Sequence, residues 1–308
     1  MALNETEKTH LSAKGFDLRP PYEALDILAT AQMGAAWSVR SAIREIARAS
    51  EMMADAIASG GRLAYAAAGS SALMALADGL ELPGTYGIPR ERIKILIAGG
   101  LAALTDLAGA TEDDELQAAR DVGDAQIGAG DVLIAISASG STPYALAAAA
   151  AARSRGATVI GIANNRGATL FETTDVGICL PTPPEVIAGS TRMGAGTAQK
   201  IALNMLSTMM ATRLGHVHDG YMVNVLADNL KLKGRARRII AEVAGVDESE
   251  AGDWLERAQG SVKAAILMAA GADDLPTARL LLERTHDRLR PALSILRTGA
   301  NSAQRTAS

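Results

Sequence analysis

Val132 to Ile162 reads VLIAISASGSTPYALAAAAAARSRGATVIGI, and this stretch predicts the fold of the chain around it. Val132 to Ile136 is a continuous apolar run with the length and β-branched content of a strand buried on both faces. Pro143 follows where the first turn of a helix tolerates a missing N–H, and the alanines after it are strong helix formers. Gly156 ends this helix, and Thr158 to Ile162 supplies the next buried strand. The stretch therefore predicts a right-handed β-α-β unit of a parallel sheet.

The loop between this strand and helix, residues 137–142, is rich in hydroxyl groups. It follows the carboxyl end of a strand, where open α/β folds bind their ligands. Free N–H groups at a helix N-terminus, ringed by hydroxyls, favour a phosphate monoester. The loop lacks the lysine of a nucleotide P-loop and the G-x-G-x-x-G spacing of dinucleotide sites, so a phosphosugar is the better candidate. Alternatively, the serines and the threonine of this loop serve only as turn and N-cap residues, which is their usual role. These residues are Ser137, Ser139, Ser141 and Thr142.

The same pattern occurs earlier in the chain. Arg62 to Ala68 is a predicted strand, Gly69-Ser70-Ser71 is a second hydroxyl-bearing loop, and Ala72 to Ala77 begins a helix. Two such loops on one parallel sheet are harder to explain as accidental capping than one. Further strands are predicted at Lys94 to Ala98 and Val176 to Leu180, which brings the total to five.

Composition excludes several classes of protein. The length of 308 residues allows one large domain, or a main domain with helical additions. A net charge of -4 argues against a nucleic-acid partner, which would require a basic face. The single Cys179 lies in an apolar run, so it cannot form an internal disulfide or a cysteine metal cluster and is expected in the core. Residues 1–10 are polar, and no stretch approaches the roughly 20 apolar residues of a membrane span, so we expect a soluble cytoplasmic protein without a membrane partner.

Five motifs at separate points of the chain carry a resemblance to a known family. They are Gly69-Ser70-Ser71, the segment 137–144, Gly189-Ser190-Thr191-Arg192-Met193, Ala195-Gly196-Thr197-Ala198-Gln199-Lys200 and Asn204-Met205-Leu206-Ser207-Thr208. Together they closely resemble the N-acetylmuramic acid 6-phosphate etherases, sugar-isomerase (SIS) domain enzymes that are similar also to the glucokinase regulatory protein. The likeness is strong from about Gly60 to Ile240 and weak over the C-terminal residues.

The resemblance implies a fold and a division of the chain. The fold is α/β, a flavodoxin-like five-stranded parallel sheet flanked by helices, with a small C-terminal helical module. We expect an N-terminal arm and helix over 1–58, the SIS phosphosugar-binding domain over 59–235 and the helical module over 236–308. Tyr22 to Ala58 has helical spacing, and Asp247 and Asp274 are helix start signals within the module. The resemblance also implies a homodimer with sites near the subunit interface.

Two glutamates match the residues that act in the family reaction. Asp78-Gly79-Leu80-Glu81 precedes a proline, and Glu81 matches the acid that protonates the departing lactyl oxygen. Glu112, between Gly109-Ala110 and Asp113, matches the base that removes the proton at C2. One carboxylate must start ionised and the other protonated, so their pKa values should differ. No metal or cofactor is implied, and the 6-phosphate would be held by the serine loops, through Ser71, Ser137 and Ser141 with support from Ser70, Ser139 and Thr142.

Three positions that are usually cationic in the family are neutral in this chain. Family members usually have Gly-Arg where this chain has Ala72-Leu73, arginine where it has Ser141, and lysine where it has Gly194. A charge-assisted hydrogen bond to phosphate contributes roughly 1.5 to 3 kcal/mol, so their loss either changes the preferred substrate or is compensated elsewhere. Residues of this kind are more often surface or structural charges than ligand contacts. The candidate cations are Arg192, Lys200, Lys231 and Arg235.

The resemblance therefore predicts a carbon-oxygen lyase of amino sugar metabolism. It would convert N-acetylmuramic acid 6-phosphate to N-acetylglucosamine 6-phosphate and D-lactate, by elimination and then water addition, in the recycling of peptidoglycan sugars. The alternatives are a non-catalytic phosphosugar-binding regulator and an aldose-ketose isomerase of the SIS class. His216 and His218 stay outside the predicted site, because a helix C-terminus is an ordinary place for histidine.

Overall fold

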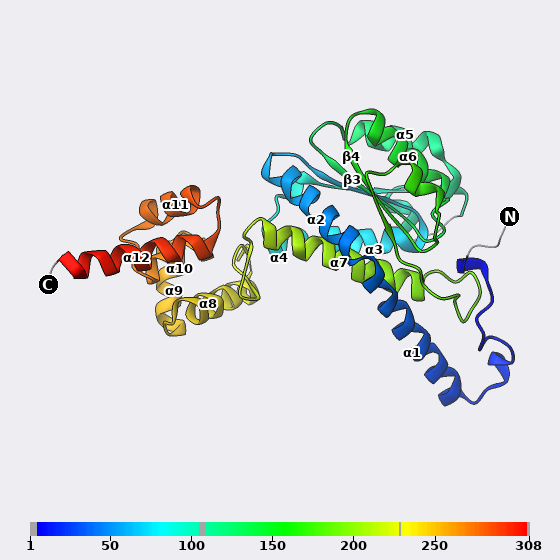
Figure 1. Ribbon diagram of the computed structural model, residues 1–308, viewed down its shortest axis with the longest axis horizontal. Coiled ribbons are helices and arrows are strands. Elements are labelled where there is room, and N and C mark those ends of the chain that lie inside the picture. Colours follow the sequence, from blue (N-terminus) through cyan, green and yellow to red (C-terminus); the bar gives the residue numbers. More distant parts are fainter. Residues whose placement is uncertain (1–4, 105–108, 228, 307–308) are drawn as a thin grey trace. The chain divides into compact units, whose positions relative to one another are not determined.

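The computed structural model describes residues 5–104, 109–227 and 229–306, and the chain divides into two compact units (Figure 1). The first unit consists of Met1–Leu80 and Arg90–Met209, and the second consists of Glu81–Pro89 and Met210–Ser308. The expected division at 58/59 and 235/236 stays a prediction. No helix among the described residues is long and apolar enough to cross a membrane.

A five-stranded parallel sheet forms the centre of the first unit, which confirms the predicted fold class. Every expected strand is present, with ends shifted by one residue or less. Along the sheet the order is β2-β1-β3-β4-β5. The strands are β1 (Leu63–Ala67), β2 (Ile93–Ile97), β3 (Val132–Ser137), β4 (Thr158–Ala163) and β5 (Val176–Cys179).

This strand order creates a switch point between β1 and β3. In register, Ala67 at the end of β1 pairs with Ile136 of β3. From β1 the chain leads to β2 on one side, and from β3 it leads to β4 on the other. Ligands of open α/β sheets bind in the crevice outside the carboxyl ends of such neighbouring strands. The helices that follow are α3 (Gly69–Gly79) after β1 and α6 (Pro143–Ser154) after β3, so both serine segments lie at this switch point.

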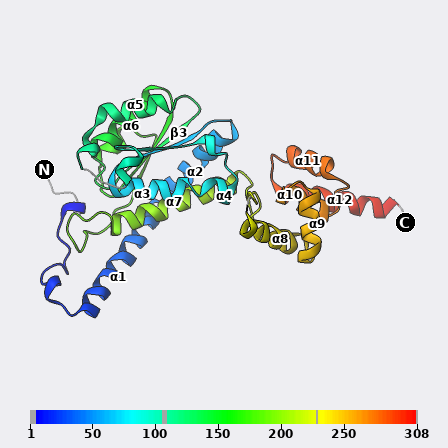
Figure 2. The ribbon, with the colours of Figure 1, turned by 180° about the vertical axis from the view of Figure 1, so that it is seen from behind.

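Helices cover both faces of the sheet (Figures 1 and 2). On one face α6 and α5 (Glu115–Asp124) pack against a layer of small side chains that includes Ala64, Ala66 and Ala135. Alanine on both sides of this contact lets helix and sheet backbones approach closely, which accounts for the alanine-rich sequence. On the other face lie α3, α2 (Ile43–Ala58) and α7 (Gly194–Arg213).

The N-terminal helical region is interrupted rather than continuous. Between α1 (Pro21–Ser38) and α2 the chain makes a tighter 3-10 turn, Val39–Ala42. Further short 3-10 helices are Glu5–Glu7, Phe16–Leu18, Arg90–Arg92, Leu101–Leu104, Gly109–Asp113 and Thr169–Thr173. Cys179, expected in the core, is only half-buried because it lies at the end of the edge strand β5. Burial still raises the pKa of its thiol, so it stays protonated.

The second unit is mainly helical. It contains a short antiparallel hairpin, β6 (Val217–His218) and β7 (Tyr221–Met222), and the helices α4 (Leu82–Tyr86), α8 (Leu230–Ala244), α9 (Glu248–Arg257), α10 (Val262–Ala269), α11 (Leu275–Arg284) and α12 (Leu289–Thr306). The predicted start signals are confirmed, because Asp247 accepts from the Glu250 N–H and Asp274 from the Thr277 N–H, both at 2.8 Å.

A buried lysine lies in the core of this helical unit. The helix α10 is its centre, with nearly every side chain buried. Lys263 on this helix is 2% exposed, and its ammonium donates to the backbone carbonyl and the carboxylate of Asp287. Burial lowers the pKa of Lys263, while the Asp287 carboxylate opposes that shift. The pair therefore joins α10 to the segment before α12.

Candidate functional site

The second serine loop is held by a network of its own hydroxyl groups. Ser137 Oγ accepts from the Gly140 N–H at 2.9 Å and hydrogen-bonds to Thr142 Oγ1 at 2.8 Å and to Ser139 Oγ at 3.2 Å. Ser141 donates to Ser139 Oγ from both its N–H (3.2 Å) and its hydroxyl (3.1 Å). The structure thus brings all four predicted loop residues into one connected cluster directly after β3.

The N-terminus of α6 has no side-chain cap. Thr142 occupies the N-cap position, but its side chain accepts no capping hydrogen bond and instead contacts Ser137. The capping interpretation is therefore wrong for Thr142. The first N–H groups of α6 remain available to an anion, which the helix dipole also favours.

A glycine brings the loop close to a neighbouring segment. Gly140 has a φ of +72°, and a Cβ there would lie 2.3 Å from the Cβ of Ala168. Its carbonyl accepts from the Leu170 N–H at 2.9 Å. Only glycine fits both this backbone conformation and this contact.

The first serine segment belongs to a helix and not to a loop. The helix α3 begins at Gly69, which places Ser70 and Ser71 in its first turn. The preceding Ala68 is the N-cap residue and provides no side-chain cap. Ser71 is buried and Ser70 is partly exposed. The first turn of α3 therefore offers N–H groups at the switch point, as the first turn of α6 does.

Glu112 lies directly beside this helix start. A Cβ on Gly69 would be 2.6 Å from Glu112 Oε1, so the carboxylate packs against the glycine backbone in a place that a larger residue would fill. The 3-10 turn Gly109–Asp113 carries Glu112 to this position. Burial raises the pKa of Glu112, and the like charge of Asp113 raises it further. The structure thus brings two parts of the predicted site close together, namely the first serine segment and Glu112.

Asn165, which the sequence analysis did not single out, supports the second serine loop. Its amide donates to the carbonyls of Ala138 (3.2 Å) and Ser139 (3.1 Å). The same side chain joins the N-terminal arm, because it donates to Thr6 Oγ1 at 3.0 Å and accepts from the Thr6 N–H at 3.3 Å. Asn165 follows β4, and a polar residue at the carboxyl end of a parallel strand is the signal that could have indicated it.

A buried carboxylate links α3 to the long helix α7. Asp78 accepts from Tyr65 Oη (2.9 Å), Asn204 Nδ2 (3.0 Å) and Ser207 Oγ (2.9 Å). Burial raises the pKa of Asp78, while these hydrogen bonds and the charge of Lys200 oppose the shift. Two residues of the motif 204–208 therefore hold Asp78 in the structure.

Glu81 follows this network three residues along the chain. It is exposed and precedes α4, and the Thr85 N–H donates to its backbone carbonyl at 3.0 Å. Glu81 belongs to the second unit and Glu112 to the first. The predicted catalytic pairing of the two glutamates stays a prediction.

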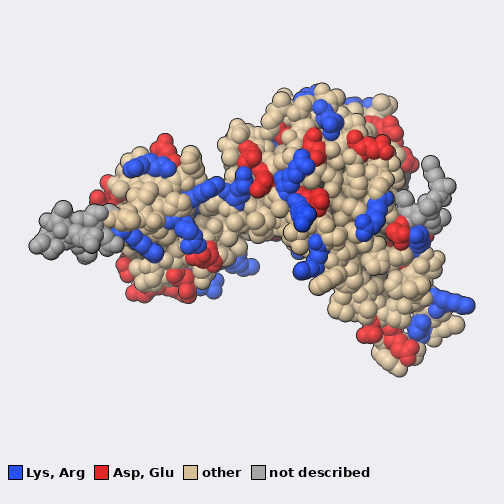
Figure 3. Space-filling model, in the orientation of Figure 1, with Lys and Arg blue, Asp and Glu red and all other residues tan. Residues whose placement is uncertain are grey.

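The candidate cations differ in their surroundings. Lys200 donates to Asn204 Oδ1 and so takes part in the Asp78 network. Arg192 is exposed before α7, Lys231 is exposed on α8, and Arg235 reaches the sulfur of Met222 at 3.8 Å. On the face drawn in Figure 3, Lys and Arg are interspersed with Asp and Glu.

The N-terminus of α7 is occupied by a side chain of this chain. Glu185 is buried, and its carboxylate accepts from the N–H groups of Gly194 (2.9 Å) and Ala195 (2.8 Å). This helix start is therefore capped, in contrast to those of α3 and α6, and it is not a phosphate site.

Fold and site together define a SIS-domain protein. The SIS domain family matches residues 36–164, which contain both serine segments and Glu112. The structure is also similar to a phosphoheptose isomerase from Francisella tularensis, with a TM-score of 0.50 and 17% identity over 63% of this chain and all of that one. At this identity the likeness shows the fold alone.

Sequence relatives give the particular family. An N-acetylmuramic acid 6-phosphate etherase of Deinococcus radiodurans is 43% identical over 85% of this chain and 86% of its own length. The etherase of Geobacillus thermodenitrificans is 38% identical over 94% of this chain and 98% of its own. The chain belongs to the N-acetylmuramic acid 6-phosphate etherase family.

The Asp78 network makes a prediction about stability. Ser207→Ala removes one of the three donors to a buried carboxylate, and we expect it to lower the free energy of unfolding by about 1 to 3 kcal/mol. Denaturant unfolding of the purified chain measures the effect. Ser154→Ala is the control, because that hydroxyl is exposed and donates to the Ala151 carbonyl of its own helix. Equal losses in the two variants would contradict a special contribution from Ser207.

Proposed function

We propose that this chain is an N-acetylmuramic acid 6-phosphate etherase that releases D-lactate and N-acetylglucosamine 6-phosphate. The observation that carries the proposal is its identity of 43% over 85% of the chain to an etherase. The reaction is a carbon-oxygen bond cleavage, followed by the addition of water to the double bond that the cleavage leaves.

The 6-phosphate would bind at the switch point between β1 and β3. Two uncapped helix starts support this placement, those of α3 and α6, because their N–H groups and dipoles favour an anion. The hydroxyls of Ser70, Ser71, Ser139 and Ser141 would add donors around the same edge, and Ser137 with Thr142 would hold the loop in shape.

Glu112 is the proposed base. In the open-chain aldehyde, the proton at C2 is acidified by the carbonyl at C1, and the Glu112 carboxylate would accept it. The electron pair left at C2 forms the C2–C3 double bond as the C3–oxygen bond breaks, and the lactyl oxygen leaves with its electrons. Glu81 would protonate that oxygen. The partly desolvated position of Glu112 supports its role, because a raised pKa makes a carboxylate a stronger base.

A regulator that binds a phosphosugar without turnover is the second candidate. It is favoured by the neutral residues at three positions where the family is usually cationic, namely Leu73, Ser141 and Gly194. The presence of both Glu81 and Glu112 favours the enzyme over the regulator. An aldose-ketose isomerase would share the proton transfer at C2 but would release no lactate.

We also propose that the chain forms a homodimer and acts in the cytoplasm, where peptidoglycan sugars are recycled. The helix α1 supports the dimer, because four of its large apolar side chains are exposed: Tyr22 71%, Leu25 64%, Met33 66% and Trp37 70%. Their spacing places them along one side of the helix. A row of this kind in water is typical of a surface that a second subunit covers.

The first test follows both products of the proposed reaction. We incubate the chain with N-acetylmuramic acid 6-phosphate in deuterated water and expect D-lactate together with deuterium at C2 of the amino sugar. Glu112→Gln and Glu81→Gln should each lower the rate of lactate release at least a hundredfold, because each removes one proton transfer. Full activity of Glu112→Gln would exclude it as the base. Binding without turnover in the wild type would support the regulator.

The pH profile tests the environment of Glu112. Its raised pKa means that the carboxylate is protonated at a higher pH than usual, so activity is lost as the pH falls through that pKa. Asp113→Asn removes the like charge and should move the acidic limb of kcat/KM to lower pH. Glu115→Gln, an exposed acidic residue two positions further on, is the control. An unmoved limb in Asp113→Asn would contradict the assignment of that limb to Glu112.

The dimer is tested on α1. Leu25→Glu with Met33→Glu places two charges in the exposed apolar row, and we expect light scattering to show a shift from dimer to monomer. Leu280→Glu on α11 is the control, because this leucine is also exposed, at 54%. A dimer that survives the α1 changes would show that another surface holds the subunits together.

A further inference from the structure

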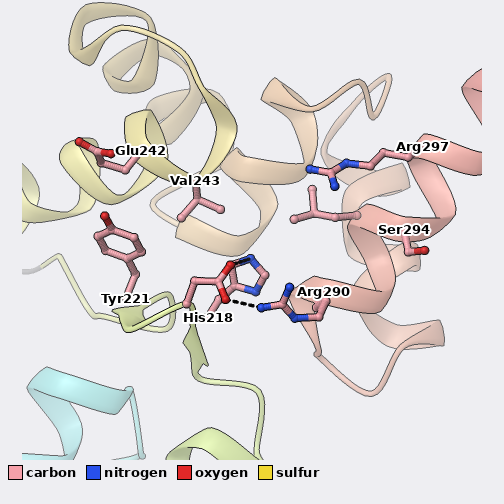
Figure 4. Close-up of a pocket in the computed structure, with 9 residues that line it drawn as sticks. His218, Tyr221, Glu242, Val243, Arg290, Ser294 and Arg297 are labelled. Atoms are coloured by element: carbon pink, nitrogen blue, oxygen red, sulfur yellow. Dashed lines mark hydrogen bonds and ion pairs between the residues drawn. The ribbon is translucent and has the colours of Figure 1, made fainter.

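A pocket of about 400 Å³ lies within the second unit, outside every residue of the candidate site. It is formed by the β6–β7 hairpin, α8 and α12 (Figure 4). Val243 and Leu293 give it an apolar lining, and its other lining residues carry polar or charged groups. Its volume falls in the range of about 300 to 1,000 Å³ that is typical of small-molecule sites.

Two arginines of α12 line one side of this pocket. Arg290 and Arg297 are seven positions apart, so they lie on the same face of the helix. Arg290 forms an ion pair with Asp219 of the hairpin. For Arg297 no ion pair was found among the residues that the structure describes, and Figure 4 shows its guanidinium directed toward the pocket. A guanidinium without a partner at a pocket wall is suited to a carboxylate or phosphate group.

The opposite side of the pocket presents hydrogen-bonding groups of another kind. Tyr221 and Glu242 lie there, across from α12 (Figure 4). A phenol and a carboxylate accept hydrogen bonds from hydroxyl groups. The pocket also carries two acidic and two arginine side chains, so its charge balances, and a highly charged anion would be disfavoured. The lining fits a ligand with one anionic group at one end and hydroxyls at the other.

We propose that this pocket is a second ligand site, which binds a phosphorylated or carboxylated carbohydrate of monosaccharide size. Arg297 binds the anionic group, Glu242 and Tyr221 bind hydroxyls, and the sugar ring covers Val243 and Leu293. The site is built from residues 218–297, whereas the serine segments and Glu112 belong to the other unit. The proposal requires no turnover, and it therefore holds or fails independently of the etherase activity.

Chemical modification of the arginines tests the proposal residue by residue. The full chain is treated with phenylglyoxal, and peptide mass spectrometry follows the modification rate of Arg297. We expect N-acetylglucosamine 6-phosphate or glucuronate to slow this rate several-fold, and inorganic phosphate at the same concentration to slow it much less. Equal protection by phosphate would show simple anion binding, and no protection by either sugar would overturn the site.

Binding measurements on variants provide the second readout. In a chain that carries Ser139→Ala and Ser141→Ala, calorimetry with N-acetylglucosamine 6-phosphate should still detect a site. Adding Arg297→Gln should weaken that binding by about 10- to 100-fold, as expected for the loss of a charge-assisted contact. Arg238→Gln, an exposed arginine of α8 outside the pocket lining, makes the same charge change and should leave the affinity unaltered. Unchanged affinity in Arg297→Gln would overturn the proposal.

Discussion

The pairing of β1 with β3 in a parallel sheet is the constraint on which the first unit depends. Because Ala67 is in register with Ile136, the two strands end side by side, and the segments that follow them begin at the same edge. The chain then leaves toward opposite sides of the sheet, which opens the edge between the two helix starts. Neither helix start is capped by a side chain. Two anion-favouring dipoles therefore meet at one place, and this follows from backbone topology before any catalytic side chain is considered.

Close packing at Gly69 positions the proposed base, Glu112. Gly69 has a φ of +53° and leaves room for the Glu112 carboxylate against the backbone of α3. A larger residue at this position would displace the carboxylate from the first serine segment. On the far end of α3, Asp78 is held by donors from β1 and from α7. A carboxylate thus lies at each end of α3, one buried among hydrogen bonds and the other partly exposed beside the proposed phosphate site.

Local pattern was sufficient to predict most elements of the fold but few of the contacts that shape the site. The strands, the proline at the start of α6 and the capping aspartates Asp247 and Asp274 depend on neighbouring residues, and the sequence shows them directly. Asn165 and Thr6 are 159 positions apart, and Asp78 and Asn204 are 126 apart, so no local spacing indicates either contact. The pocket lined by Arg297 was missed for the same reason, because its lining comes from the hairpin and from two helices well separated in the sequence.

The neutral residues at three usually cationic positions have two opposing physical consequences. Fewer cations near the phosphate weaken binding, since each charge-assisted contact is stronger than a neutral one. A cation near Glu112 would also stabilise its ionised form and lower its pKa. In this chain the neighbouring charge that shifts Glu112 is the like charge of Asp113, which raises the pKa together with burial. We infer that the neutral residues Leu73, Ser141 and Gly194 reduce the affinity for the phosphosugar but leave the pKa of Glu112 raised, and that dipoles and hydroxyls at the helix starts supply the remaining attraction for phosphate.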